Sequence, residues 1–447
     1  MSIFRQGRFF YWLIKELTDK YTKLFTIGII LGALCFISIK KLSTIAPIEI
    51  GQGVERIAVV GDYTVSDIPA SILSLMSYGL TTIEANGSPS AGLSDAWEAT
   101  DSGKTYIFHL NPTKTWHDGT KVVAKDINYQ IRGVTIETPD PQTIVFHTDT
   151  PYSPFPVVVG RPVFKKGLVG VGSYTLGRVR IKAGMVQTLL LNPVDSKLKQ
   201  KQYTFYKTET AAITAYKLGE IDRLEGLETL PPQVTSWTNT EVIPEIKFNR
   251  VLTLFFNTSD NLLRDKAIRQ GIAYSLPKFP DTEPAFSPIQ KTSWAYEEKV
   301  KHYDPNEKLS KQLLKDILSA TSSAELTLNT FTPYLPAANI IADHLEKLGL
   351  KITVKVEETL PSSYQMLLTA RDLPVDPDQY AFWQSTQENT NISNYVNVKI
   401  DKLLEDARLE QDYDKRNILY SDFQKRLVDD APAVFLYHPT TYTIVRK

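Results

Sequence analysis

The sequence predicts an α/β protein of two lobes that follow an amino-terminal transmembrane helix. Three observations lead to this fold class: an uncharged apolar run near the start, two strand–helix–strand units more than a hundred residues apart, and a length of 447 residues. At roughly 100–200 residues per domain, this length suffices for two or three domains that each bury a core. Each unit implies a partly parallel sheet covered by helices, because parallel strands need crossover connections.

The composition excludes several function classes. Lys+Arg and Asp+Glu both number 50, so no long-range positive field exists to attract nucleic acid. The single cysteine, Cys35, excludes an intramolecular disulfide and a thiolate-rich zinc site. The six histidines form no His-Glu-x-x-His pair, and neither a phosphate-binding glycine loop nor a Gly-x-Ser-x-Gly elbow is present. We therefore expect no metal, no cofactor, no catalytic residue and no nucleic-acid partner.

The first element is an apolar run with lysines at both ends. Residues 24–39 read LFTIGIILGALCFISI, between Lys23 and Lys40. At 1.5 Å rise per residue they span roughly 24 Å, somewhat less than a hydrocarbon core of about 30 Å. Lysine side chains that reach outward and local thinning of the bilayer can absorb the difference. The run is therefore typical of a membrane-spanning helix.

The residues before this run indicate its orientation. Basic side chains surround the aromatic cluster Phe9–Trp12, as is typical of a cytoplasmic, interfacial segment under the positive-inside rule. We predict a cytoplasmic segment over 1–23, a single transmembrane helix over 24–41 that contacts the lipid bilayer, and a linker over 42–55. The protein would then lie in the cell membrane with its main part outside the cytoplasm.

A cleaved signal peptide and a lipidated cysteine are the two alternatives to an anchor. Cleavage needs small residues before the cut, and the sequence Ala-Leu-Cys-Phe over 33–36 offers a poor site. A lipoprotein signal would carry Gly or Ala before Cys35, where this chain has Leu34. We prefer the anchor, and both alternatives remain open.

Short β-rich runs and amphipathic helices alternate after residue 48. Ser66-Asp67 is typical of a helix cap, and the apolar spacing that follows predicts a helix over 68–76. Alternating side chains predict strands over 106–110 and 143–147. The first strand–helix–strand unit is expected over 204–224, with its helix at 209–218.

The second unit lies beyond Pro231-Pro232, which suggests one unit in each lobe. We expect a strand over 326–331, a helix from Pro336 to Gly349 and a strand over 352–356. The chain then reads as helical from 398 to about 428. An apolar run over 433–437 is expected to return to a sheet.

An acidic cluster beside aromatic residues is the strongest candidate site. Asp372, Asp376 and Asp378 lie in a segment that two prolines stiffen, so we expect a loop. Such carboxylates can pair with a ligand ammonium, and the nearby ring of Trp383 can stack on a ligand. The alternative is a solvated acidic turn beside core aromatics. A glycosidase would need carboxylates about 5–10 Å apart, a separation that the sequence leaves open.

Other motifs are better explained by structure than by chemistry. Trp116-His117-Asp118-Gly119 is typical of a turn whose tryptophan covers the core. His438 before Pro439 is expected to pack rather than to bind a metal. The glycine-rich segment 167–172 lacks the helix that a dinucleotide site requires. The tyrosine of Asp62-Tyr63, after the first β-rich run, completes the set of candidate ligand-binding residues.

Taken in order, several motifs resemble the extracellular solute-binding proteins of family 5, the oligopeptide-, dipeptide- and nickel-binding proteins of ABC importers. Each motif alone is weak, but their shared order is specific, and the resemblance covers about 56–438. The motifs that carry it are Trp116–Thr120, Ala124–Ile127, Gly170–Tyr174, Leu218–Asp222, Phe256–Thr258, Ala267–Tyr274 and Leu403–Arg408.

The resemblance implies a two-lobed, periplasmic-binding-protein-like (type II) fold whose lobes close over a ligand about hinge strands. It places lobe I over 56–250 with a reduced extra subdomain at about 85–150, lobe II over 251–432 and a return strand over 433–447. In this family an aspartate before the Asp-Pro-Asp turn takes the amino group of a bound peptide. That role would fall to Asp372 first and to Asp376 second.

The function that follows is that of a membrane-anchored substrate-binding protein, not an enzyme. It would capture a short peptide, or a similarly small polar solute, for an ABC permease. The chain departs from the family pattern: segments near 131–133 and 275–288 are shortened, and the strand before the Asp-Pro-Asp turn is expected to be missing over 370–375. These departures motivate an alternative, a two-lobed interaction or sensory module that no longer serves import. A hydrolase using the acidic cluster is a third and weaker possibility.

Overall fold

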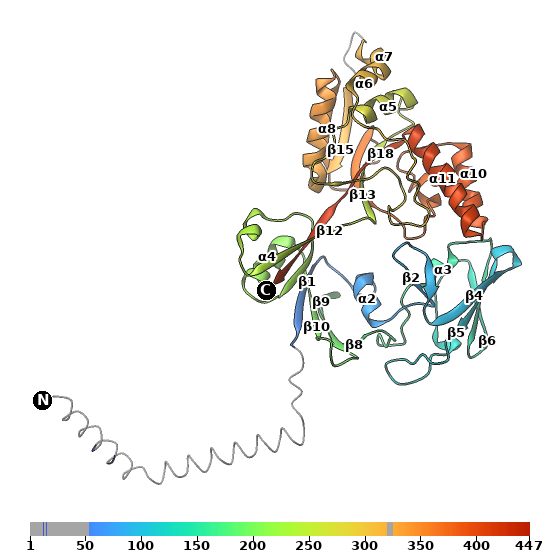
Figure 1. Ribbon diagram of the computed structural model, residues 1–447, viewed down its shortest axis with the longest axis vertical. Helices are drawn as coiled ribbons and strands as arrows, with labels where there is room; N and C mark the ends of the chain where they lie inside the picture. Colours follow the sequence, from blue (N-terminus) through green and yellow to red (C-terminus); the bar gives the residue numbers. More distant parts are fainter. Residues whose placement is uncertain (1–11, 13–14, 16–52, 320–324) are drawn as a thin grey trace. The chain divides into compact units, whose positions relative to one another are not determined.

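The computed structural model describes Trp12, Lys15 and residues 53–319 and 325–447. Residues 55–195 with 201–447 form one compact unit, and the described residues Trp12, Lys15, 53–54 and 196–200 belong to a second unit. In the second of these, the Lys15 ammonium lies 5.5 Å from the centre of the Trp12 ring. The first contains two lobes (Figure 1). Lobe I comprises residues 55–195, 201–246 and 440–446, and lobe II comprises residues 250–438.

Lobe I is built on a seven-stranded sheet with the order β12-β19-β11-β1-β10-β9-β8. Its central strand β1 runs parallel to both β10 and β11, so the helix α4 between these two strands makes the crossover. The first predicted strand–helix–strand unit is thereby confirmed. The elements are β1 (Glu55–Val60), β8 (Tyr174–Lys182), β9 (Met185–Pro193), β10 (Lys201–Tyr206), α4 (Glu209–Lys217), β11 (Arg223–Leu227), η3 (Pro232–Ser236), β12 (Thr240–Ile246) and β19 (Thr440–Arg446).

The helix α2 (Ala70–Met76) packs on this sheet through Ile72 and Met76. It begins two residues later than predicted. The carboxylate of Asp67 accepts hydrogen bonds from the backbone and the hydroxyl of Thr64 and therefore does not cap the helix.

A smaller antiparallel sheet, in the order β4-β5-β7-β6, completes lobe I. Its core is aromatic: Tyr106, Phe108 and Phe146 all lie against Phe155, at ring-centre distances of 4.8–6.4 Å. The predicted strands over 106–110 and 143–147 are confirmed. The elements are β2 (Thr81–Ile83), β3 (Pro89–Ala91), β4 (Ser94–Thr100), η1 (Asp101–Gly103), β5 (Thr105–Leu110), η2 (Ala124–Asp126), β6 (Val134–Asp140), β7 (Thr143–Thr148) and α3 (Phe155–Val158).

Lobe II is built on a six-stranded sheet with the order β14-β18-β13-β17-β15-β16. The strands β15 and β16 are parallel neighbours in the sheet, and helix α8, which lies between them in the sequence, makes the crossover. The second predicted strand–helix–strand unit is thereby confirmed. The elements are β13 (Arg250–Phe256), β14 (Glu283–Pro284), β15 (Glu325–Phe331), η4 (Thr332–Tyr334), α8 (Leu335–Lys347), β16 (Lys351–Glu357), β17 (Met366–Asp372) and β18 (Ala433–His438).

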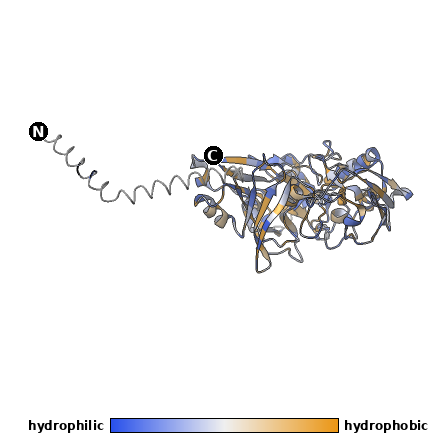
Figure 2. Ribbon diagram, turned by 90° about the horizontal axis from the view of Figure 1, so that it is seen from below, coloured by the Kyte–Doolittle hydropathy of each residue, from blue (hydrophilic) through white to orange (hydrophobic). Residues whose placement is uncertain are grey.

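Helices cover both faces of this sheet, so its central strand β13 is buried from Val251 to Phe256. On one face Leu254 packs with helices α5 and α8, and on the other Phe255 packs with α10 and α11. Figure 2 colours each residue of the ribbon by its hydropathy, with hydrophobic residues in orange. The remaining helices are α5 (Lys266–Ser275), α6 (Glu307–Leu313), α7 (Lys315–Leu318), α9 (Tyr380–Trp383), α10 (Val398–Leu409) and α11 (Tyr413–Asp430).

Two predictions for this lobe are wrong. The expected helix over 398–428 is two helices, because Glu410 and Asp412 adopt extended backbone and the Asp412 side chain caps α11 through the Lys415 N–H. The strand expected to be missing over 370–375 is present as the end of β17. β17 pairs with β13 along the whole length of both strands. Because backbone groups make this pairing, the polar side chains at the end of β17 do not prevent it.

The chain crosses between the lobes twice, at neighbouring positions. Residues 247–249 join β12 to β13, and Pro439 alone joins β18 to β19. The Lys247 N–H donates to the Pro439 carbonyl at 2.9 Å, so the two links lie side by side as a hinge. Here His438 is buried against Phe248, with Nδ1 2.8 Å from the Arg250 carbonyl oxygen, which is the packing role expected of it.

Among the described residues, no helix is both long and apolar enough to cross a bilayer. The predicted transmembrane helix over 24–41, which includes Cys35, lies outside the residues that the structure describes, as does the segment over 1–23 apart from Trp12 and Lys15.

Candidate functional site: the cleft between the lobes

The parallel strands of the two lobes direct their carboxyl ends toward the hinge. In lobe I these ends lead into Asp62-Tyr63, after β1, and Glu228, after β11. In lobe II they lead into Tyr334, after β15, and reach Asp372, the last residue of β17. Ligands of open α/β sheets bind at the carboxyl ends of the parallel strands, so this edge is the first place to look for a site.

A row of three charged side chains joins the two edges. The Arg250 Nη1 lies 3.5 Å from a Glu228 oxygen of lobe I, and its Nε lies 3.4 Å from an Asp372 oxygen. The Nε makes no hydrogen bond to any described residue, and the Asp372 side chain is 78% exposed. Burial raises the pKa of the neighbouring Tyr334, whose hydroxyl therefore stays neutral. The Asp372 carboxylate is thus loosely held and open to a solute.

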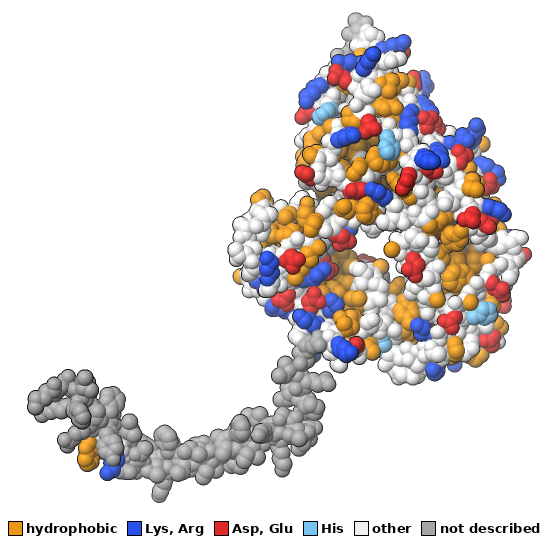
Figure 3. Space-filling model, viewed as in Figure 1, with side chains coloured by type: hydrophobic (Ala, Val, Ile, Leu, Met, Phe, Trp, Pro, Cys, Tyr) orange, Lys and Arg blue, Asp and Glu red, His pale blue; other side chains and the backbone are white. Residues whose placement is uncertain are grey.

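A cavity of about 700 Å³ lies between the lobes; the loop that follows Asp372 lines it, and Asp372 itself does not. Lobe I lines it with Tyr78, Tyr152 and Arg161, and lobe II lines it with the loop 374–378. This volume falls within the range of about 300–1,000 Å³ that is typical of ligand sites. Figure 3 shows the hollow between the two lobes.

Contacts between the lobes bound this cleft on the side away from the hinge. The backbone N–H of Ser153 donates to the Arg408 carbonyl at 2.8 Å, and its hydroxyl donates to the Ala407 carbonyl at 3.0 Å. Both carbonyls belong to the last turn of α10, where helical partners are lacking. The Tyr106 hydroxyl also donates to Gln411 Oε1 at 3.0 Å. The cleft is therefore held between the hinge and this second contact.

The structure places Asp376 at the wall of the cavity but turns its charge inward. Its carboxylate accepts two hydrogen bonds from the Arg416 Nη2, at 2.9 and 3.2 Å, and the two side chains are only 8% and 1% exposed. Burial would lower the pKa of Arg416, but the attraction of Asp376 outweighs it and raises the pKa above its ordinary value. This aspartate already has a permanent counter-ion.

Asp378 and Trp383 also have partners within lobe II. The Asp378 carboxylate accepts a hydrogen bond from the Arg408 Nε at 2.8 Å and another from the Tyr380 N–H, which begins α9. Trp383 is buried and stacks on Phe255 with 6.1 Å between ring centres. Asp378 lines the cavity while paired, whereas Trp383 belongs to the core behind it.

The tyrosine of Asp62-Tyr63 lies at the carboxyl edge of lobe I. Its hydroxyl donates to the Val60 carbonyl at 3.3 Å, and its ring meets Phe205 edge to face at 5.3 Å. Asp62 itself is exposed, with an oxygen 3.4 Å from the Lys207 ammonium. These contacts make Tyr63 part of the packed wall of lobe I, and it is not among the residues that line the cavity.

Sequence reasoning missed Arg161, which lines the cavity from lobe I. Its side chain is exposed, and within the described ranges no carboxylate comes within 4.0 Å of its guanidinium. An arginine in this setting can bind a ligand carboxylate through two parallel hydrogen bonds. Nothing in the sequence separates Arg161 from other surface arginines, because only the packing of α3 and the loop after it brings this residue to the cavity.

The turn motif at Trp116 has the structural role expected of it. Trp116 is buried and its Nε1 donates to Asp126 at 3.1 Å, while the His117 Nε2 lies 2.8 Å from the Gly172 carbonyl. Gly170 and Gly172 lie directly against the backbone at the end of α2. No group of three or more potential metal ligands occurs within the described part of the chain.

Comparison with known sequences places the chain among binding proteins. Residues 128–395, more than half of the chain, match the family model described as bacterial extracellular solute-binding proteins, family 5 Middle. The dipeptide-binding protein of Escherichia coli K12 is 22% identical over 444 residues, which cover 80% of this chain and 82% of that protein.

Solved structures share the same architecture. An ABC-transporter substrate-binding protein of Listeria monocytogenes superposes with a TM-score of 0.74 at 22% identity, over 88% of this chain and 94% of that one. The oligopeptide-binding protein AppA of Bacillus subtilis, solved in complex with a nonapeptide, gives 0.66 at 18% identity, over 88% and 94%. These likenesses show that the predicted two-lobed α/β fold is correct.

Proposed function

Because the chain belongs to family 5 of the bacterial extracellular solute-binding proteins, we propose that it captures a short peptide, or a similarly small polar solute, in the cleft between its lobes and delivers it to an ABC permease. One observation carries this proposal: both lobes line a cavity of about 700 Å³, and the loop of lobe II that lines it follows directly on Asp372, whose side chain is 78% exposed. The names of the relatives, a dipeptide-binding protein and an oligopeptide-binding protein, support a peptide as the solute.

The roles proposed for the charged residues depend on which of them are already held by a close counter-ion within the protein. Asp372 takes the amino group of the ligand, since Asp376 and Asp378 are already paired with arginines. Arg161 takes a carboxylate on the opposite side of the cleft. The apolar lining between them, including Val157 and Val375, accommodates side chains with little selectivity.

Ligand binding is expected to favour the closed arrangement of the lobes. The hinge consists of two short links, so the lobes can move as rigid bodies about residues 247–249 and Pro439. A ligand that contacts both lobes binds the closed state better and increases its population. The closed surface is then the signal that the permease reads.

The proposal includes a membrane anchor. Residues 24–41 have the length and composition of a transmembrane helix, and 1–23 have the basic and aromatic character of a cytoplasmic flank. The lobes then lie outside the cytoplasm, tethered to the membrane that holds the permease. Proteolysis of intact cells from outside, followed by detection of a protected amino-terminal fragment, tests this arrangement. A lobe fragment released without protease would instead indicate cleavage.

A cognate peptide should stabilise the protein by mass action. At 100 times the dissociation constant, a ligand that binds only the folded state adds about 2.7 kcal/mol to the free energy of unfolding. A thermal-shift screen of di-, tri- and oligopeptides measures this directly. The contrary result has two parts: no peptide raises the melting temperature, and pull-downs recover receptor or envelope proteins instead of a permease. The function would then be that of the alternative, a two-lobed interaction or sensory module that does not serve import.

Asp372→Asn should weaken binding of a peptide with a free amino group by about 10- to 100-fold, or roughly 1.5–3 kcal/mol, because it removes the charge that pairs with the ammonium. Binding of the same peptide after acetylation should change little. Isothermal titration calorimetry measures both. Asp343→Asn, at an exposed position on α8 in the same lobe, is the matched control and should leave both affinities unchanged. Equal losses for the free and the acetylated peptide would remove Asp372 from the site.

A further inference from the structure

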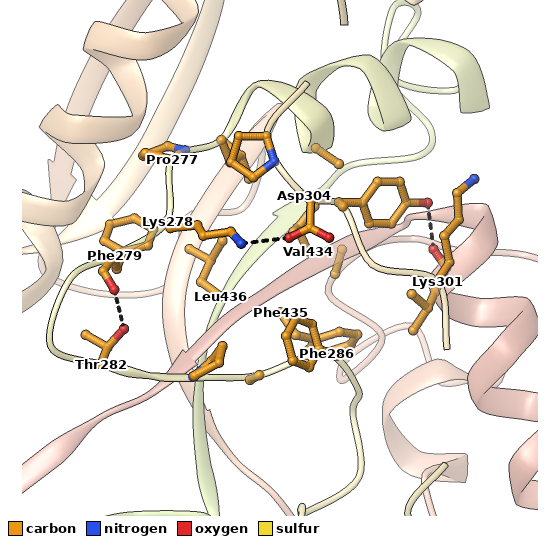
Figure 4. A pocket seen from close by; sticks show the side chains of 18 residues that line it. Pro277, Lys278, Phe279, Thr282, Phe286, Lys301, Asp304, Val434, Phe435 and Leu436 are labelled. Carbon is orange, nitrogen blue, oxygen red and sulfur yellow. Dashed lines mark hydrogen bonds and ion pairs between the residues drawn. The ribbon is translucent and has the colours of Figure 1, made fainter. Parts of the chain in front are cut away.

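A second cavity lies entirely within lobe II and shares no lining residue with the cleft. Its volume is about 290 Å³. The segments 276–286 and 301–305 form its walls and the strand β18 forms its floor (Figure 4). It lies where the loop after α5 returns to the sheet through β14. Nothing in the proposed peptide site uses it.

The interior of this lobe II cavity is apolar. Phe279, Phe286, Val434 and Leu436 line it, and two hydroxyl groups of the wall are satisfied by the protein itself. Thr282 donates its hydroxyl to the Phe279 carbonyl at 2.9 Å (Figure 4). The Tyr303 hydroxyl likewise donates to the Val428 carbonyl at 2.8 Å. A ligand side chain that enters therefore meets mainly hydrocarbon and aromatic faces.

The lining of the cavity includes an exposed ion pair, Lys278 with Asp304, and a second lysine, Lys301, which is paired with Asp429. The Lys278 ammonium lies 2.9 Å from an Asp304 oxygen, and the side chains are 76% and 66% exposed (Figure 4). Hydrogen bonding to Lys278 holds the pKa of Asp304 below its ordinary value, so this carboxylate is charged at neutral pH. Exposed pairs of this kind contribute little to stability, so a ligand can share them at small cost.

We propose that this lobe II cavity binds a free apolar α-amino acid. The side chain of the amino acid occupies the apolar interior, its carboxylate accepts from Lys278, and its ammonium donates to Asp304. In an α-amino acid a single carbon separates the ammonium from the carboxylate. This close spacing matches the Lys278 ammonium and the Asp304 carboxylate, which are in direct contact. The volume is at the lower end of the range for drug-sized ligands, so it suits one residue rather than a peptide.

The test uses the full-length chain and L-phenylalanine as the probe. Calorimetric titration should show binding, and the affinity should fall about tenfold or more for β-phenylethylamine, which lacks the carboxylate, and for 3-phenylpropionate, which lacks the ammonium. Absence of phenylalanine binding, or equal affinity for the three compounds, would overturn the proposal.

Variants then locate the site. Lys278→Gln and Asp304→Asn, both at exposed positions where folding is not at risk, should each weaken phenylalanine binding by about tenfold. Lys311→Gln, which breaks an exposed ion pair with Glu307 in the same lobe, is the matched control and should have no effect.

Two further variants separate this cavity from the cleft. Leu436→Trp should fill the cavity and abolish phenylalanine binding, whereas Asp372→Asn should leave it unchanged. Loss of binding in Asp372→Asn together with normal binding in Lys278→Gln would place the phenylalanine in the cleft and refute the second site. Phenylalanine binding and peptide binding are measured in separate experiments. A negative result with phenylalanine would therefore not contradict the proposed peptide site.

Discussion

Replacing Arg416 by methionine is expected to lower the free energy of unfolding by about 3–5 kcal/mol. The substitution leaves the Asp376 carboxylate at 8% exposure without its cation, and the two hydrogen bonds between them are lost. The methionine keeps most of the volume beside Tyr420, so the loss comes from the stranded charge rather than from a cavity. Urea unfolding followed by circular dichroism measures the change.

The same helix provides the control. Arg426 forms an exposed ion pair with Asp422 at 2.9 Å on α11, and Arg426→Met should cost less than about 1 kcal/mol. The double variant Asp376→Leu with Arg416→Met should recover much of the lost stability, because it removes both charges. A loss in Arg416→Met no larger than that in Arg426→Met would contradict a desolvated pair. Failure of the double variant to recover would attribute the loss to packing.

Gly170→Ala is expected to lower the free energy of unfolding by about 3 kcal/mol. A methyl group at this position would overlap the backbone carbonyl oxygen of Met76 at the end of α2. Backbone cannot move aside as a flexible side chain can, so α2 must shift. Since Ser74 and Ser77, on and beside α2, line the cleft, the variant should also lose part of its thermal response to peptide. Urea unfolding and the peptide thermal shift provide the two readouts.

Gly184→Ala separates the effect of space from that of backbone conformation. Gly184 lies in the turn between β8 and β9 with a φ of +79°, and no atom lies within 4 Å of a Cβ placed there. The cost is then only that of a left-handed alanine, about 1 kcal/mol. If both glycine variants lose the same stability, close approach to Met76 is not the reason for Gly170.

Local patterns in the sequence predicted much of the fold. The two strand–helix–strand units were predicted correctly because each one forms from a contiguous segment with its own cap and stop, such as Thr208 before α4. The single long helix over 398–428 was wrong because a short extended link at Glu410–Asp412 changes little in the hydrophobic pattern. The end of β17 was missed for the opposite reason, since its pairing with β13 joins residues more than a hundred positions apart.

The sequence by itself determined that this is a two-lobed binding protein and that an acidic loop is its candidate site, because both follow from neighbouring residues and their order. Only the tertiary structure decided which carboxylate is available. Asp376 meets Arg416 and Asp378 meets Arg408, whereas Asp372 is left open beside Arg250. The charge that an aspartate presents to a ligand depends on which cation packs against it, and that cation comes from a distant part of the chain.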